Sequence, residues 1–152
     1  MSTAARRVPA DADRVAPAPA AIGRPARLDE PAFQGMLRVA CALEFVGHGA
    51  FGIITKAGWV PYFAVAGVPE WLAWRLMPLI GTIDITLGVL VLLRPFRVAL
   101  LYMALWGFWT ALLRPLSGEP PWEFLERMPN WAVPLAFLYV RGVRRSWMEW
   151  LS

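Results

Sequence analysis

The chain has few of the residues that usually carry redox, metal or nucleophilic chemistry, since its 152 residues include one cysteine, Cys41, and one histidine, His48. A single thiol excludes an internal disulfide, a CxxC redox pair and a thiolate-rich metal site. The sequence also contains no GxSxG motif, no phosphate-binding Walker loop, no dinucleotide fingerprint and no CxxCH haem-attachment motif. Because no complete catalytic signature is present, we do not expect this chain to act as an independent enzyme.

Hydrophobic residues, by contrast, are abundant: they make up 58% of the chain, which includes nine tryptophans, and the mean hydropathy is +0.47. A transmembrane helix needs ~20 mostly apolar residues, and this sequence supplies several such runs. The formal charge of +4 comes largely from arginines beside these runs. Arginines in that position are typical of topology signals, so we expect no nucleic-acid partner. The composition predicts an all-α integral membrane protein.

The apolar runs predict a four-transmembrane-helix bundle in residues 32–152, preceded by an arm at residues 1–31. Frequent prolines and little apolar surface predict that this arm is disordered. A short amphipathic helix is expected near 121–128, and the Pro- and Gly-rich stretch between the first two spans reads as an interfacial or re-entrant loop. The last span is short for a full crossing. The predicted spans are about 33–55, 71–93, 96–113 and 130–143.

The distribution of cations predicts the orientation of these spans. Four crossings place the arm, the turn at 94–97 and the C-terminal tail on one side, with ten arginines, against four cations on the other. Loops on the cytoplasmic side carry an excess of Lys and Arg. We therefore expect a multi-pass protein of the inner (cytoplasmic) membrane with both termini in the cytoplasm.

Three ionisable residues stand inside the predicted spans: Glu44 and His48 in the first, and Asp84 in the second. Such a group costs roughly 2.5–3.5 kcal/mol at membrane depth, so it persists only with a partner or a function. The i,i+4 spacing of Glu44 and His48 permits a hydrogen bond between them. These residues are candidates for proton handling, although helix–helix adhesion through buried polar groups explains them equally well. One histidine among mixed hard and soft donors is a poor ligand set, so no metal site is expected.

Aromatic residues of the third span form the candidate ligand-binding wall. Tyr102, Trp106, Trp109 and Thr110 share one side of the helix at a depth similar to that of the ionisable residues. Such a wall suits a flat ring or a lipid tail, but interhelical packing produces the same pattern. Arg114 ends this span, where it fits either a clamp for an anionic headgroup or a cap for the helix C-terminus.

Three stretches resemble the DoxX-like family of small four-helix membrane proteins, a group that includes DoxD-type and MauE-type members. They are RVACALEFVGHGAFG at 38–52, IGTIDITLGVLVLL at 80–93 and WGFWTALLRPLSGEPPWEFLERMPNWAVPLAFL at 106–138. The resemblance implies a four-helix bundle and an association with quinone-linked oxidation, terminal oxidases, thiosulfate oxidation or redox-stress complexes.

The resemblance gives functional expectations for the residues in the matching segments, which are Glu44, His48, Asp84 and Arg114. We expect an integral membrane subunit or accessory protein of a quinone-linked redox system, with a bound quinone and no covalently attached cofactor. The expected partners are the lipid bilayer and either further membrane subunits or a second copy of the chain. Two other functions fit the sequence: a non-catalytic assembly subunit of a larger membrane complex, and a small lipid-binding or transport protein.

Overall fold

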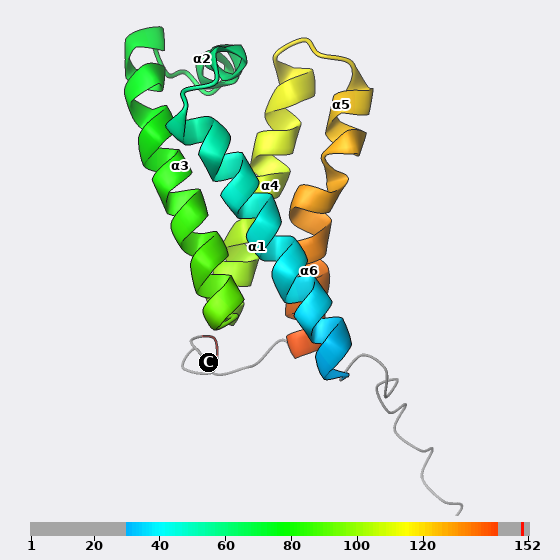
Figure 1. Cartoon of the computed structure of the whole chain (residues 1–152). Coiled ribbons are helices and arrows are strands. Elements are labelled where there is room, and N and C mark those ends of the chain that lie inside the picture. The colour runs from blue at the N-terminus through cyan, green and yellow to red at the C-terminus, as the bar shows by residue number, and fades with distance from the viewer. Residues whose placement is uncertain (1–29, 143–149, 151–152) are drawn as a thin grey trace, which may run out of the picture.

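A computed structural model describes residues 30–142 and residue 150, and these residues form helices without any strand (Figure 1). The arm at 1–31 therefore lies outside the described residues except for its last two, and most of the C-terminal tail lies outside them as well. The helical segments are α1 (Pro31–Ile53), the 3₁₀ turn η2 (Ala57–Trp59), α2 (Val60–Val65), α3 (Glu70–Leu93), α4 (Arg97–Leu116), α5 (Pro121–Glu126) and α6 (Met128–Arg141).

Three helices are long and apolar enough to cross a membrane: α1 with 23 residues, α3 with 24 and α4 with 20. They agree with the first three predicted spans to within three residues at each end. The start of α1 follows from local chemistry. Its first residue, Pro31, lacks a backbone N–H, and an N–H in the first turn of a helix has no acceptor within that helix. The prediction of a multi-pass membrane protein thus rests on three spans.

The predicted fourth span corresponds to α6, which is not among these three helices. Its 14 residues extend about 21 Å, against a hydrocarbon core of ~30 Å. Pro129 lies in its first turn, and the break from α5 falls at Arg127. The short helix expected near 121–128 is present as α5, which ends at Glu126.

The stretch between α1 and α3 is not the loop that its prolines and glycines predict, because it forms η2 and α2. Pro61 stands in the first turn of α2, and Gly67 follows the helix with a φ of 76°. A proline in the first turn and a glycine just past the last turn are typical of the two ends of a helix. In Figure 1, α2 lies beside the upper ends of α3 and α4, and it contacts both helices.

The long helices pack as two pairs, α1 with α3 and α4 with α6, while the consecutive helices α3 and α4 contact each other sparsely. Glycines bring the backbones together within each pair. A Cβ on Gly49 would lie 2.5 Å from the carbonyl oxygen of Gly81, and a Cβ on Gly107 would lie 2.5 Å from that of Asn130. These glycines therefore serve contacts within the bundle.

The two pairs meet through a core at the lower end of Figure 1 and diverge toward the upper end. Phe45, Leu100, Met103 and Phe137 belong to this core and are almost fully buried. The first residue of α1 and the last of α6 also lie at the lower end. A cavity lined by residues of both pairs lies above this core.

Candidate functional site

The cavity has a volume of about 220 Å³ and lies between the upper parts of the two helix pairs. The short segments η2 and α2 form part of its wall, so the residues that the sequence assigned to a loop help to enclose it. The lining is mainly aromatic and aliphatic, with a few polar groups. Its members include His48, Trp59, Phe63, Ile80, Trp106, Trp109, Thr110, Arg114, Arg127 and Asn130.

His48 is held at this cavity by Asp84, because its Nδ1 lies 3.3 Å from Oδ2 of the carboxyl group. Asp84 is 1% exposed, and the imidazole stacks on Trp59 with ring centroids 4.6 Å apart. The expected hydrogen bond between Glu44 and His48 is not formed. The glycine contacts between α1 and α3 bring the buried carboxyl group within reach of His48, and a fully buried carboxyl group loses more than a partly exposed one when it has no partner.

Glu44 is half-buried and makes no hydrogen bond to another residue in the described part of the chain. It lines a second, much smaller cavity of about 10 Å³ together with His48, Thr110 and Asn130. This volume is close to the ~10–15 Å³ that one water molecule needs. Glu44 and His48 are thus brought to a common polar space without touching each other.

The four residues of the candidate aromatic wall do not all line the cavity. Trp106, Trp109 and Thr110 line the cavity, but Tyr102 does not. Tyr102 stacks on Trp106 with ring centroids 6.2 Å apart and is 42% exposed. One helical turn separates Tyr102 from Trp106, and the cavity ends within that turn because the helix pairs converge toward the core.

Arg114 lies in the last turn of α4, where it is 9% exposed and paired with two carboxylates. Its Nη1 lies 3.1 Å from Oε2 of Glu119 and 3.0 Å from Oε2 of Glu123. The guanidinium carbon lies 5.3 Å from the ring centroid of Tyr62, whose hydroxyl donates a hydrogen bond to Glu119. These contacts tie α4 to α2 and to the segment that enters α5.

Tyr62 stays a hydrogen-bond donor at neutral pH. Burial, followed by the hydrogen bond to Glu119, raises the pKa of Tyr62 from 10.0 to about 12. The neutral phenol therefore persists well above physiological pH, and its hydrogen bond to Glu119 persists with it.

Several lining residues were missed by the sequence argument, namely Trp59, Tyr62, Arg127 and Asn130. The signal for the first two was the aromatic density of the segment WVPYF at 59–63, which is unusual for a loop. Arg127 is one of the four cations that the charge distribution places opposite the cytoplasmic side. Asn130 had been taken as the start of a span, and no pattern in the sequence places it beside the first helix.

Three buried polar atoms around the cavity have no hydrogen-bond partner in the described part of the chain: Asp84 Oδ1, Trp106 Nε1 and Arg127 Nε. Leaving such an atom without a partner costs about 1–3 kcal/mol, which marks it as a candidate contact for water or a ligand. Within residues 30–142 and 150, no group of three or more His, Cys, Asp or Glu side chains is placed to hold a metal ion.

Comparisons with models of known families, with characterised proteins and with solved structures find no match for this chain.

Proposed function

We propose that this chain is an integral membrane subunit or accessory protein of a quinone-linked redox system, and that its cavity holds the ring of a quinone. The observation that carries the proposal is a mainly aromatic and aliphatic cavity of about 220 Å³, in whose lining the buried Nε1 of Trp106 has no hydrogen-bond partner among the described residues. The DoxX-like resemblance of the sequence points to the same class of function.

The residues present fit such a ring by size and by chemistry. A dry cavity of ~150 Å³ accommodates benzene, so about 220 Å³ leaves room for ring substituents. Trp106 and Trp109 provide flat apolar walls. Trp106 Nε1 is a donor without a partner among the described residues, and a quinone carbonyl is an acceptor that would satisfy it.

When bound, a quinone supplies two-electron, two-proton redox chemistry, and the residues of this chain would bind it and manage protons. The contact with Asp84 occupies Nδ1 of His48, which leaves Nε2 as the imidazole nitrogen available to the cavity. Asp84 orients the imidazole. Glu44 reaches the polar space beside His48 and is a candidate to exchange protons with it through one water.

The proposal includes a fourth membrane crossing made by α5 and α6 together. The start of α1 and the end of α6 lie at the same end of the bundle, which requires an even number of crossings (Figure 1). The segment from Pro121 to Arg141 is continuous apart from the break at Arg127. With the arginine-rich end toward the cytoplasm, both termini lie on the cytoplasmic side of the inner membrane.

The deciding experiment is purification of the full chain in mild detergent, followed by solvent extraction and mass spectrometry of the bound small molecules. We expect a stoichiometric quinone with the wild type and with Thr86→Val, an exposed position on the far side of α3. We expect no quinone with His48→Ala, and a reduced amount with Asp84→Asn. The proposal fails if the wild type carries only lipid, or if His48→Ala retains the quinone in full.

A non-catalytic assembly role is the second candidate, and the contact between His48 and Asp84 favours it because this contact joins α1 to α3. In that case the same substitutions would lower the amount of folded protein and the recovery of partner subunits. The activity of each complex that still assembles would be normal. A small lipid-binding or transport protein would instead retain one defined lipid in the cavity.

A further inference from the structure

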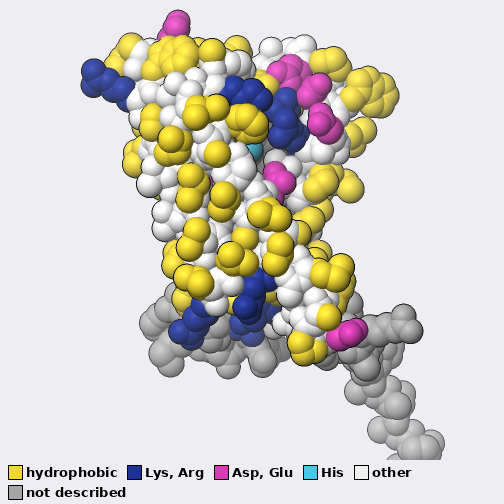
Figure 2. Space-filling view, viewed as in Figure 1, with side chains coloured by type: hydrophobic (Ala, Val, Ile, Leu, Met, Phe, Trp, Pro, Cys, Tyr) yellow, Lys and Arg dark blue, Asp and Glu magenta, His cyan; other side chains and the backbone are white. Residues whose placement is uncertain are grey.

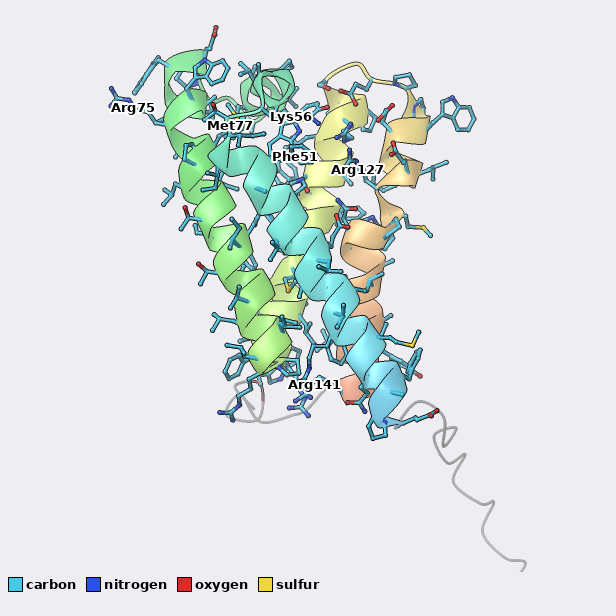
Figure 3. The ribbon with its side chains drawn as sticks, in the orientation of Figure 1. Phe51, Lys56, Arg75, Met77, Arg127 and Arg141 are labelled. Atoms are coloured by element: carbon cyan, nitrogen blue, oxygen red, sulfur yellow. The ribbon has the colours of Figure 1, made fainter. Side chains whose placement is uncertain are left out.

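A second charged region lies at the end of the molecule opposite the cavity, and it contains Arg38, Arg94, Arg97 and Arg141, here called the basic cluster. These arginines come from α1, from the turn between α3 and α4, from the start of α4 and from the end of α6. Figure 2 shows dark blue side chains gathered at this lower end, and Figure 3 labels Arg141 there.

The cluster brings like charges close together. Arg38, Arg94 and Arg97 each repel the guanidinium of Arg141. Arg97 is fixed in place, because its Nε donates to the carbonyl oxygen of Gly142 at 3.0 Å and its Nη2 donates to that of Arg141 at 3.1 Å. Gathering cations at the edge of a low-dielectric region costs free energy, and a bound anion recovers that cost.

Two members of the cluster have capacity for an anion. Neither Arg38 nor Arg94 forms an ion pair within the part of the chain that the structure describes. The Nε atom of Arg38 is buried and has no hydrogen-bond partner there. Arg94 is exposed, and its guanidinium carbon lies 5.1 Å from the ring centroid of Phe96.

Orientation in the membrane alone does not require this arrangement. A topology signal needs only that arginines stand in the segments that flank the spans, whereas here three helices and a turn bring them together. Exposed apolar side chains adjoin the cluster, since Leu93 is 72% exposed and Val98 is 45% exposed. An anion with attached acyl chains therefore matches this region better than a soluble anion does.

We propose that the basic cluster binds the phosphate group of an anionic phospholipid, with the acyl chains against the apolar surface beside Arg94. Basic pockets between transmembrane helices are a recurring form of lipid headgroup recognition. The guanidinium groups offer planar pairs of donors that match phosphate oxygens. This inference does not depend on the quinone proposal.

The test is a titration of the purified full chain in detergent with phosphatidylglycerol or phosphatidylcholine, followed by native mass spectrometry. The double variant Arg38→Gln/Arg94→Gln is compared with Lys56→Gln/Arg75→Gln, which removes the same charge from exposed positions at the opposite end (Figure 3). We expect the wild type to prefer phosphatidylglycerol, and its affinity to fall on the order of 30-fold in the first variant only.

Two outcomes overturn the proposal. One is equal binding of both lipids by the wild type, as expected if a carboxylate of the chain itself neutralises the cluster. The other is an equal loss of affinity in both double variants, which would indicate an effect of net charge alone. A third variant, Arg38→Lys/Arg94→Lys, keeps the charge that sets membrane orientation but loses the planar donors, so its affinity should lie between those of the wild type and the glutamine variant.

Discussion

Within each helix pair the backbones touch through glycine, whereas between the pairs side chains of several kinds fill a widening gap. At the α1–α3 contact, Gly81 faces Gly49 and Gly52 so closely that no Cβ fits. Between the pairs, aromatic residues leave a cavity of about 220 Å³ above the core. The contacts within pairs therefore set the shape of the bundle, and the space between the pairs is where a ligand can be held.

The largest expected effect on stability comes from losing a glycine contact within a helix pair. Gly81→Val would place side-chain atoms where the backbone of α1 now lies, and should destabilise the protein by about 3 kcal/mol or prevent folding. Gly47→Val is the control, because a Cβ at Gly47 meets nothing within 4 Å. Thermal unfolding in detergent measures both variants. Equal losses would mean that helix propensity, rather than the contact, determines the cost.

A smaller effect is expected at the aromatic wall of the cavity. Trp106→Phe keeps a flat ring but removes the Nε1 donor, so we expect quinone affinity to fall about tenfold, as for one lost hydrogen bond to an acceptor in an apolar site. Tyr102→Phe should leave the affinity unchanged, because Tyr102 lies outside the cavity. Isothermal titration with a short-chain quinone distinguishes the two variants. If Tyr102→Phe is the weaker binder, the site extends below the cavity.

The smallest effect concerns the hydrogen bond from Tyr62 to Glu119, and it depends on pH. Because the folded pKa of Tyr62 is raised from 10.0 to about 12, its stabilising contribution is complete below about pH 10 and is lost as the pH rises toward 12. Tyr62→Phe should cost about 0.5–1 kcal/mol at neutral pH. The stability difference between wild type and variant should shrink over this alkaline range. A difference that does not change with pH would rule out this hydrogen bond as its source.

Hydropathy and helix periodicity predicted the helices that are determined by the residues within them. The three long spans and the ionisable residues within them could be found because apolar runs and buried charges are visible in a single sequence. The partner of His48 could not be found in this way. Spacing favoured Glu44 in the same helix, while Asp84 lies in another helix and reaches His48 only because glycines bring the two backbones together.

The segment 57–65 forms a short 3₁₀ turn and a helix that the sequence alone did not predict. Its proline and the glycine after it predict a loop, although the same residues mark the ends of a short helix. Only its contacts with α3 and α4 determine that it folds back over the cavity. The extent of the aromatic wall, which excludes Tyr102, likewise depends on where the helix pairs converge.

The hydrogen bonds of Arg97 to the last residues of α6 also set an order for biosynthesis. Arg97 is synthesised more than forty residues before its acceptors, the carbonyl groups of Arg141 and Gly142. The start of α4 can therefore be joined to the end of α6 only after residues 141 and 142 have been synthesised. A chain that stops before Arg141 contains α1, α3 and α4 in full but lacks both acceptors, so the start of its α4 has neither of these two attachments.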